Sequence, residues 1–353
     1  MKIIHVLNHI EEIGNGIVNV AIDLAIEQKN KGHDVAIVSR GGGFEQLISK
    51  YGIKHYQINI NKNLINAPKI LLSLYSIIKE FKPDIVHAHM MTGAIYSKIL
   101  KSISNYKLIT TVHNEFQKSA IIMGVGDRVI CVSNAVAKSM INRGIDKKKI
   151  RTILNGTIGS VRVKGTEELH PKNLKGISIV TVAGMNIRKG IAELLDAFEK
   201  ISESYPDANL YIVGDGPDRS LFEAKANKIK SVDRIHFEGF QNEPLRYMMG
   251  ADIFILASHK DPCPLVLSEA RNAGCAIIGS NVDGIPEALD NGKAGILVKA
   301  GDSEELAEAL EKLLNNPFEL EKWKEQSRRN LERFTVNRVT QETLNVYGEM
   351  YLR

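Results

Sequence analysis

The sequence predicts an α/β protein with two doubly wound, Rossmann-like domains that face each other across a cleft. Short apolar runs alternate with amphipathic stretches along the chain, and this alternation is interrupted once, near the middle. The 353 residues are enough for two domains, each with a sizeable core. Alternating strands and helices form parallel sheets covered on both faces. Ligands bind beyond the carboxyl ends of such strands, so two facing domains would enclose a cleft.

The first half of the chain has the pattern of one such domain. Short apolar runs are typical of buried strands, and longer stretches with apolar residues three or four apart are typical of helices. We expect strands at residues 3–7, 34–38, 85–89, 108–112 and 128–132. We expect helices at residues 18–31, 67–81 and 93–101.

The alternation weakens between residues 156 and 176, where glycines and charges occur without a clear period. We interpret this segment as the linker between an N-terminal domain of residues 1–160 and a C-terminal domain of residues 161–335. The second series of strands is expected at residues 177–182, 210–213, 235–237, 253–256, 276–279 and 295–298. Helices are expected to begin near residues 191, 219, 244, 264, 285 and 303, and the segment from residue 318 to the end is charged and helical in pattern.

The composition is that of an ordinary globular protein, with 44% hydrophobic and 25% charged residues. The best apolar candidate for a membrane span, residues 70–78, has about half the required length. The first residues lack the pattern of a signal peptide and are predicted to form a buried strand. The three cysteines, Cys131, Cys263 and Cys275, are far apart and odd in number, which indicates free thiols in a reducing cytoplasm.

Charge is unevenly divided, although the net charge is only +5. Residues 1–160 contain 21 Lys and Arg against 11 Asp and Glu, a balance of +10, and the remainder contains 25 against 30, a balance of −5. A basic first half favours an anionic partner such as lipid headgroups, a phosphate-bearing acceptor or nucleic acid. The alternative is a basic surface that only maintains solubility.

Asp261 and Glu269 lie eight positions apart in a segment that runs from a proline-containing loop into a helix. Pro264 suits the first turn of that helix, because its missing N–H would be unpaired there anyway. Backbone N–H groups near Leu265 and Val266 would point outward and, with the helix dipole, form a site for phosphate. Asp261 would lie in the preceding loop and Glu269 about one turn inside the helix. Carboxylates that bind hydroxyls beside an anion site suit a nucleotide sugar, and the alternative is an ordinary surface loop and helix.

A glycine-containing turn follows the first predicted strand. Gly14 and Gly16 would let the backbone approach a phosphate or a sugar closely. A dinucleotide-binding fingerprint would need another glycine near Asn19 and an acid after the second strand, where Ser39 and Arg40 stand. NAD binding is therefore disfavoured, and a plain tight turn is the alternative.

Histidines stand at or just past two strand ends. Alternation places His87 and His89 on one face of their strand, a spacing that could bind a metal, but no third ligand is evident nearby. A hydrogen-bonded structural histidine is the better interpretation of His87. His113 ends the next strand and would point to the cleft, where we expect a ligand contact.

The loops of the second half carry two cations and further glycines. Gly184, Arg188 and Lys189 follow its first strand, and adjacent cations in a strand-to-helix loop can neutralise a diphosphate. A solvated pair is the alternative. Gly214 begins a turn after the next strand, and Phe240 follows the third strand, where its ring could contact a base. The sequence has neither a P-loop motif nor an Asp-x-Asp motif, so a metal-chelated diphosphate is not supported and the cations take the charge-neutralising role.

Together these segments resemble the family-4 retaining glycosyltransferases, which have the two-domain GT-B fold. The resemblance spans nearly the whole chain and is strongest from Val180 to Val298. Each motif is weak alone, but their order and spacing are highly specific. The motifs are Leu154-Asn155-Gly156, Arg188-Lys189-Gly190, Val213-Gly214-Asp215-Gly216-Pro217, Ala251-Asp252-Ile253-Phe254, Pro264-Leu265-Val266-Leu267-Ser268-Glu269-Ala270 and Gly284-Ile285-Pro286-Glu287.

The resemblance implies roles for the matching residues of the second domain. Glu269 would hold the ribose hydroxyls of the donor nucleotide. The backbone at Leu265 and Val266 would meet the diphosphate, with Lys189 and Arg188 as its cations. The full set implied to bind the donor is Gly14, Gly16, Gly184, Gly214, Phe240, Pro264, Leu265, Val266 and Glu269.

The resemblance also assigns residues near the transferred sugar. Asp261 matches the first acid of the family's Glu-x7-Glu motif, and His113 matches the donor-sugar histidine. Both join Lys189 and Arg188 in the implied catalytic set. Gly14 and Gly16 match the glycine loop of the first domain. The last helix, about residues 336–353, would cross back to the first domain.

Two departures from the family pattern affect these roles. Asp261 is one methylene shorter than the usual Glu, so its contact with the sugar would shift or be lost. Met185 stands where the family usually has an arginine, and the spacing to Lys189 is one residue short. Arg188 is the residue available to compensate.

The resemblance implies a retaining, metal-independent transfer of a hexose or N-acetylhexosamine from a nucleotide sugar, with UDP expected from its prevalence in the family. The acceptor would be a saccharide or a lipid-linked saccharide in bacterial surface polysaccharide synthesis, as for lipopolysaccharide or capsule. No cofactor, metal or nucleic acid is expected, and retaining members are thought to need no protein nucleophile.

The implied location is the cytoplasm, where a lipid-linked acceptor would be met at the inner face of the plasma membrane. The basic first domain would then touch anionic lipid beside the apolar helix of residues 70–81. The alternative is a helix that simply packs on the sheet. The lysines proposed for the contact are Lys62, Lys69, Lys79, Lys82, Lys98, Lys101 and Lys107.

Three other functions compete with this interpretation. A nucleotide-sugar 2-epimerase of the same fold would need an acid/base set that is not evident in the sequence. A cofactor-binding oxidoreductase is weakened by the broken dinucleotide fingerprint. A basic nucleic-acid-binding protein would use the first half, but that half lacks interleaved aromatic residues and a recognisable binding module.

Overall fold

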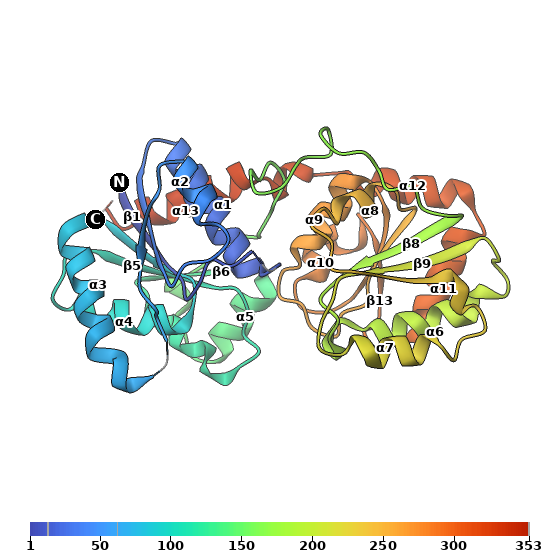
Figure 1. The fold of residues 1–353 in the computed structure, drawn as a ribbon, viewed down its shortest axis with the longest axis horizontal. Helices are drawn as coiled ribbons and strands as arrows, with labels where there is room; N and C mark the ends of the chain where they lie inside the picture. Colours follow the sequence, from blue (N-terminus) through green and yellow to red (C-terminus); the bar gives the residue numbers. More distant parts are fainter. Residues whose placement is uncertain (13, 62, 352–353) are drawn as a thin grey trace. The chain divides into compact units, whose positions relative to one another are not determined.

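The computed structural model describes residues 1–12, 14–61 and 63–351, and the chain divides into two compact units (Figure 1). Unit 1 comprises residues 1–162 and 333–353, and unit 2 comprises residues 163–332. Each unit is a parallel sheet flanked by helices, so the predicted α/β class with two Rossmann-like domains is confirmed. Lys62 and the last two residues of the predicted final helix lie outside the described part of the chain.

The sheet of unit 1 has seven parallel strands in the order β3-β2-β1-β4-β5-β6-β7. β1 pairs with both β2 and β4, so the strand order reverses there. Ligands of doubly wound sheets bind beyond the carboxyl ends of the strands at such a reversal. The strands are β1 Lys2–Val6, β2 Asp34–Ser39, β3 Lys54–Gln57, β4 Ile85–Ala88, β5 Lys107–Val112, β6 Arg128–Cys131 and β7 Ile150–Thr152.

Polar side chains cap three of the α-helices described in unit 1. Asn15 accepts a hydrogen bond from Ile17 N at the start of α1, and Ser133 and Thr335 cap α5 and α13 in the same way. The α-helices are α1 Gly16–Asn30, α2 Glu45–Lys50, α3 Ala67–Phe81, α4 Met91–Lys101, α5 Asn134–Asn142 and α13 Val336–Gly348. The 3₁₀ helices are η1 Leu64–Asn66, η2 Lys118–Val125 and η3 Lys147–Lys149.

The end of the chain forms α13, which packs on the sheet of unit 1 (Figure 1). Val346 and the fully buried Tyr347 share a core with Ile3 and Ile85 of β1 and β4. Glu349, just past the helix, accepts hydrogen bonds from Arg128 Nε at 3.0 Å and from Arg151 Nη2 at 2.7 Å. Apolar burial and these charge-assisted bonds therefore bring the last helix onto the first sheet.

The sheet of unit 2 has six parallel strands in the order β10-β9-β8-β11-β12-β13, and its order reverses between β8 and β11. The strands are β8 Ile177–Val182, β9 Ala208–Val213, β10 Ile235–Gly239, β11 Ile253–Leu256, β12 Ala276–Ser280 and β13 Ile296–Val298. The α-helices are α6 Ile191–Ser202, α7 Arg219–Ala226, α8 Leu245–Met249, α9 Leu265–Ala273, α10 Ile285–Ala288, α11 Ser303–Leu314 and α12 Pro317–Ser327. The 3₁₀ helices are η4 Ile187–Lys189, η5 Val232–Arg234, η6 Asp290–Gly292 and η7 Leu331–Phe334.

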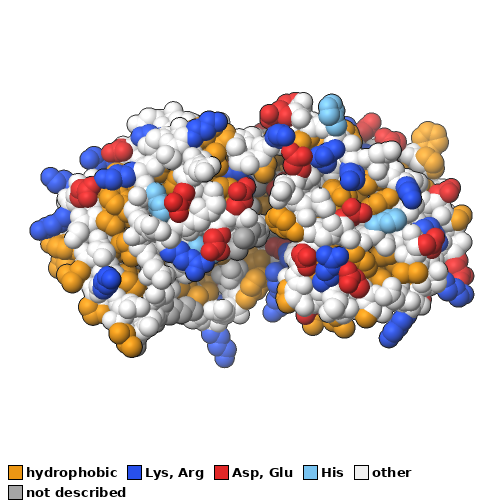
Figure 2. All heavy atoms as spheres, in the orientation of Figure 1, with side chains coloured by type: hydrophobic (Ala, Val, Ile, Leu, Met, Phe, Trp, Pro, Cys, Tyr) orange, Lys and Arg blue, Asp and Glu red, His pale blue; other side chains and the backbone are white. Residues whose placement is uncertain are grey.

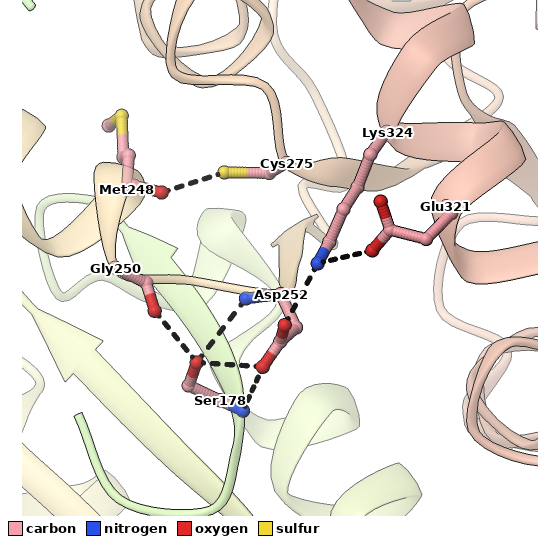
Figure 3. Close-up of polar contacts among 7 residues, drawn as sticks. All are labelled: Ser178, Met248, Gly250, Asp252, Cys275, Glu321 and Lys324. Carbon is pink, nitrogen blue, oxygen red and sulfur yellow. Dashed lines mark hydrogen bonds and ion pairs between the residues drawn. The ribbon is translucent and has the colours of Figure 1, made fainter. Parts of the chain in front are cut away.

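Polar contacts join the amino-terminal ends of β8 and β11 to α12, and that of β12 to α8 (Figure 3). Asp252 accepts hydrogen bonds from Ser178 N at 3.0 Å and from Lys324 Nζ at 3.0 Å. Ser178 Oγ also donates to Gly250 O, and Cys275 Sγ donates to Met248 O. The Ala251-Asp252-Ile253-Phe254 motif therefore has a structural role, at the sheet edge opposite the carboxyl ends of the strands.

Two strands of unit 1 were missed by the sequence analysis. β3 is an edge strand with half-buried and exposed residues, so it lacks the apolar run typical of a buried strand. β7 has only three residues. The described part of the chain contains no helix with the length and apolarity needed to cross a membrane.

Candidate functional site

Two loops of unit 2 meet where the strand order reverses. One is residues 183–190 after β8, and the other is residues 257–264 after β11. His259 N donates to Arg188 O at 2.8 Å, and Arg188 Nη1 donates to Lys260 O at 2.5 Å. Gly190 has φ 68°, and a Cβ on it would lie 1.9 Å from Ala257 O. Only glycine therefore allows this approach of the two loops.

Lys189 and Asp261 form an ion pair at this junction, with Nζ 2.6 Å from Oδ2. Their side chains are only 15% and 10% exposed, so the pair is shielded from water. Asp261 is also held through its backbone: its N–H donates to Asp283 Oδ2 at 2.9 Å, and its carbonyl accepts from Gly284 N at 3.1 Å. Asp283 and Gly284 follow β12, so three loops converge on Asp261.

Helix α9 begins immediately after this junction. Pro264 precedes the first helical residue in an extended conformation, φ −72° and ψ 111°, so its predicted place inside the first turn is wrong. No side chain of the described residues caps this end of α9. The N–H groups of Leu265 and Val266 lie in the first turn, where backbone donors have no partner within the helix. Glu269 is the fifth residue of α9 and is half-buried, one turn inside as predicted.

The loop after β9 packs against the loop after β8. A Cβ on Gly214 would lie 2.0 Å from Ala183 O, and Met185 N donates to Asp215 O at 2.9 Å. Met185 is fully buried in the core of unit 2. Its side chain therefore fills the core, and it does not replace the cation that the family usually has at this position.

Gly184 and Phe240 lie at the same carboxyl edge of the sheet in unit 2. Gly184 is exposed, and Asn186 Nδ2 donates to its carbonyl at 3.1 Å. Phe240 follows β10 with 58% of its surface exposed. An exposed aromatic ring at a strand end is available to stack on a ligand ring.

The glycine turn of unit 1 lies between β1 and α1. Gly14 has φ 68°, and Gly16 is the first residue of α1. The neighbouring Asn15 caps the helix with its side chain. Both glycines therefore lie at the amino-terminal end of a 15-residue helix, where the helix dipole favours negative charge.

Four histidines gather at the carboxyl ends of β1, β4 and β5. His5 is paired in register with His87 across β1 and β4, although the sequence analysis found no third histidine beside His87 and His89. That expectation is wrong, because strand pairing brings His5 across from 82 positions away. His5 Nδ1 lies 2.9 Å from His89 Nε2, and His89 Nδ1 lies 3.1 Å from His113 Nε2.

The ring nitrogens of His5, His87 and His89 lie close enough together to suggest a metal site. Each ring, however, already has hydrogen-bond partners on both nitrogens. His5 Nε2 also lies 2.8 Å from Gln28 Oε1. The two ring nitrogens of His87 lie 2.6 Å from Tyr347 Oη and 2.6 Å from Thr111 Oγ1. The donor set fits a hydrogen-bonded array better than a metal site, and the predicted structural role of His87 agrees with it.

Burial keeps this cluster neutral. Loss of solvation lowers the pKa of His5 to about 4, against a smaller opposing effect of the hydrogen bond to Gln28. Loss of solvation also lowers the pKa of His113 to about 3. The pKa values of His87 and His89 lie well below the ordinary range, first because of burial and then because of the neighbouring histidines. Neutral imidazoles can each donate one hydrogen bond and accept one.

Arg271 is a buried anchor of α9 that the sequence analysis missed. Its side chain is fully buried and donates to Ser327 O at 2.8 Å, to Ala288 O at 2.7 Å and to Asp290 Oδ2 at 2.9 Å. It also donates to Arg329 O. These bonds hold the helix that carries Glu269, and an arginine in an amphipathic pattern gives no sign of such burial.

Two family models match the chain. The model described as Glycosyltransferase Family 4 matches residues 14–157, and the model described as Glycosyl transferases group 1 matches residues 166–330. Among curated relatives, N-acetyl-alpha-D-glucosaminyl L-malate synthase of Bacillus anthracis is 25% identical, covering 96% of this chain and 94% of the relative. The lipopolysaccharide core biosynthesis glycosyltransferase LpsE of Rhizobium meliloti is 23% identical, covering 84% of this chain and 83% of the relative.

Solved structures share the fold. A glycosyltransferase from Rickettsia africae superposes with a TM-score of 0.85 at 24% identity, covering 100% of this chain and 99% of that structure. Anabaena HepE in complex with UDP-glucose superposes with a TM-score of 0.83 at 17% identity, covering 99% of this chain and 100% of that structure.

Proposed function

The chain belongs to the family-4 glycosyltransferases with the GT-B fold, and we propose that it is a retaining enzyme that uses a UDP-sugar donor. The transferred group is a hexose or an N-acetylhexosamine. The observation that carries the proposal is the convergence of Lys189, Arg188 and the uncapped start of α9 at the strand reversal of unit 2. Cations beside free backbone N–H groups are what a diphosphate requires.

The donor nucleotide is bound by unit 2. Leu265 and Val266 donate their backbone N–H groups to the diphosphate, and Glu269, one turn further along α9, accepts hydrogen bonds from the ribose hydroxyls. Phe240 offers an exposed ring for the base. Complexes of Anabaena HepE with UDP and with UDP-glucose support uracil as the base.

Catalysis rests on stabilising the leaving diphosphate. Lys189 and Arg188 neutralise the charge that develops as the glycosidic bond breaks. The released phosphate oxygen accepts the proton of the incoming hydroxyl on the same face of the sugar, so the anomeric configuration is retained without a protein nucleophile. The two cations supply the charge that a metal would otherwise supply, and the reaction is proposed to be metal-independent.

Two further residues have proposed roles toward the transferred sugar. Asp261 accepts a hydrogen bond from Lys189, so its proposed effect is to orient the ammonium group. His113 is the proposed partner of a sugar hydroxyl in unit 1, and the backbone near Gly14 and Gly16 approaches the bound substrates. Orientation of both substrates is worth several powers of ten in rate.

The acceptor is proposed to be a saccharide or a lipid-linked saccharide in surface polysaccharide synthesis, which the curated relative LpsE supports. The proposed location is the cytoplasm, at the inner face of the plasma membrane. Unit 1 exposes apolar side chains along α3 and α4, including Leu72 at 68% and Ile103, just past α4, at 64%. Lys69 and Lys98 are exposed on the same two helices. Figure 2 shows hydrophobic and basic side chains interspersed on this face.

Such a mixed surface supports peripheral contact with anionic lipid. The opposite face of α3 packs in the core of unit 1 through Ile70, Leu74 and Ile78, so the helix does not insert as a whole. We define the α3–α4 patch as Ile65, Lys69, Leu72, Ile95, Lys98, Ile99 and Ile103.

A thermal-shift panel of UDP, GDP, ADP and CMP, each with and without EDTA, tests the donor site. A ligand that binds only the folded state raises the unfolding temperature by mass action. We expect stabilisation by UDP that EDTA does not remove and that Glu269→Ala abolishes. Glu308→Ala, at an exposed position on α11, is the matched control and should keep the shift. Stabilisation by none of the four nucleotides would refute the proposed donor site, and loss of the UDP shift in EDTA would refute metal independence.

A further inference from the structure

A continuous chain of hydrogen bonds runs from the interior of unit 1 to His113. Gln28 Oε1 lies 2.8 Å from His5 Nε2, His5 Nδ1 lies 2.9 Å from His89 Nε2, and His89 Nδ1 lies 3.1 Å from His113 Nε2. The first three side chains are at most 2% exposed, and His113 is partly exposed. Among the described residues, none forms a hydrogen bond with the other nitrogen of His113, Nδ1.

With the amide oxygen of Gln28 facing His5, the direction of every bond in this chain follows. A carbonyl oxygen only accepts, so His5 carries its proton on Nε2. A neutral imidazole has one N–H, so His5 Nδ1 must accept, and His89 Nε2 must donate to it. By the same argument His89 Nδ1 accepts from His113 Nε2–H. The lone pair of His113 is then on Nδ1, which becomes a hydrogen-bond acceptor.

The rings stay neutral, as this argument requires. Burial is the main cause that lowers the pKa of His5 and of His89, and the pKa of His113 is about 3 for the same reason. Each ring therefore holds one proton near neutral pH, and the position of that proton is the only freedom left. One tautomer change in the chain would place two donors or two lone pairs face to face, at the cost of a buried hydrogen bond.

The nitrogen of the Gln28 amide also forms a hydrogen bond. Its Nε2 lies 3.4 Å from the hydroxyl of Tyr347 on α13, and that hydroxyl lies 2.6 Å from His87 Nδ1. His87 Nε2 lies 2.6 Å from Thr111 Oγ1. The amide therefore donates into one branch and accepts from the other. Reversing the amide would require the hydrogen bonds of both branches to reverse together.

We propose that Gln28 is a positioning residue that acts through His5 and His89 to hold His113 as the Nε2–H tautomer, leaving Nδ1 to accept a hydrogen bond from a hydroxyl of the transferred sugar. The tautomer assignment stands on the hydrogen-bond chain alone. The sugar contact rests on the proposed function, in which His113 meets the donor sugar. An acceptor at this position selects a ligand hydroxyl that donates, and Gln28 contributes to that selection without touching the ligand.

Nitrogen NMR of the full-length protein with ¹⁵N-labelled histidine reports the tautomer of each ring directly. The His113 signals are assigned by their loss in His113→Asn. In the wild type we expect a protonated Nε2 and an unprotonated Nδ1 for His5, His89 and His113. Gln28→Met keeps the side-chain length but removes the acceptor, and we expect the His113 signals to shift toward a mixture of tautomers.

Two matched variants separate the relay from a general disturbance. Gln28→Glu keeps an acceptor at the same place and should keep His113 as the Nε2–H tautomer. Thr111→Val breaks only the His87 branch, so it should change the His87 signals and leave those of His113 unchanged. An Nδ1–H tautomer in the wild type, or His113 signals that are the same in Gln28→Met, would overturn the relay.

Binding measurements test the sugar contact separately. Gln28→Met should weaken binding of the UDP-sugar by about 3- to 10-fold, the value of one hydrogen bond, and leave binding of UDP unchanged. Equal affinities of the UDP-sugar in wild type and Gln28→Met, with an altered His113 tautomer, would overturn the sugar contact but not the relay. Failure of the wild type to bind UDP at all would instead refute the proposed function.

Discussion

The ammonium group of Lys189 and the carboxylate of Asp261 are 2.6 Å apart, although 72 positions separate the two residues in the chain. The pair joins the loops after β8 and β11, the two neighbouring strands at the reversal of unit 2. Asp261 is one methylene shorter than the usual acid of the family motif. Its carboxylate accepts a hydrogen bond from a lysine of the same unit. Asp261 lies in the loop that leads into α9, so the pair holds the ammonium group of Lys189 near the start of that helix.

Removing Lys189 separates its catalytic role from its structural one. Lys189→Ala should lower turnover by about 10²- to 10³-fold, because a preorganised positive charge at the diphosphate is lost. It should also lower the free energy of unfolding by about 1–3 kcal/mol, because Asp261 is left shielded and unpaired. Single-turnover kinetics and urea unfolding measure the two effects.

The double variant Lys189→Met/Asp261→Asn is the sharper comparison. It removes both charges, so part of the stability should return while turnover stays low. Recovery of turnover together with stability would show that Lys189 acts only as a structural partner. Lys228→Ala, at an exposed position, is the control and should change neither quantity.

Arg271 should be among the most sensitive residues of unit 2, although the proposal assigns it no contact with the donor. Arg271→Met leaves three carbonyl groups and Asp290 without their buried donor, and we expect a loss of about 3–5 kcal/mol in the free energy of unfolding. Arg271→Lys should recover little, since one ammonium group cannot reach partners in several directions. Urea unfolding measures the effect. The exposed Arg329→Ala is the control, and a change as large there as in Arg271→Met would contradict the prediction.

The histidine cluster should make unit 1 less stable at acidic pH. The pKa of His5 is about 4 in the folded state, below the ordinary value of 6.5, and the pKa values of His87, His89 and His113 are also lowered. Between pH 6.5 and about pH 4 the unfolded chain therefore binds protons that the folded chain does not. Stability then rises with pH in this window, by about 1.4 kcal/mol per pH unit for each histidine, and does not change above it.

Urea unfolding at several pH values measures this slope. His87→Gln removes one of the titrating groups, so the number of protons taken up on unfolding near pH 5 should fall by about one. His170→Asn, at an exposed histidine, should leave the slope unchanged. An equal slope in His87→Gln and in the wild type would show that the cluster is protonated in the folded state.

The α3–α4 patch predicts reversible binding to anionic membranes. Replacing Leu72 and Ile103 by Asp removes apolar surface and adds negative charge. The fraction of protein that floats with anionic vesicles should therefore decrease by about tenfold or more, because two hydrophobic contacts are lost and electrostatic repulsion is added. Binding of the wild type should weaken steeply with salt, because surface charges are screened over about 10 Å at 0.1 M. The exposed Leu221 of unit 2, changed to Asp, is the control. Binding to neutral vesicles as strong as to anionic ones would contradict the role of the lysines.

Much of the fold was predictable from local patterns. The parallel sheets could be predicted from apolar runs such as those of β1, β8 and β11. Residues of these strands are buried on both faces of the sheet, and a short continuous apolar run is typical of such a strand. Glu269 was expected one turn inside a helix because a proline-containing loop precedes an apolar helical pattern. β3 escaped prediction because an edge strand needs no apolar run, and its hydrogen bonds come from β2.

Local patterns in the sequence predict the α/β class, the approximate strands and helices of both units and the loops that carry the proposed site. They do so because burial of one face of a strand or helix spaces apolar residues regularly along the chain. The folded structure was needed to see that Asp261 pairs with Lys189, that Arg271 is buried, and that His5 links His89 to Gln28. These polar contacts join residues from 17 to 84 positions apart. A single hydrogen bond between distant residues produces no regular spacing in the sequence from which it could be predicted.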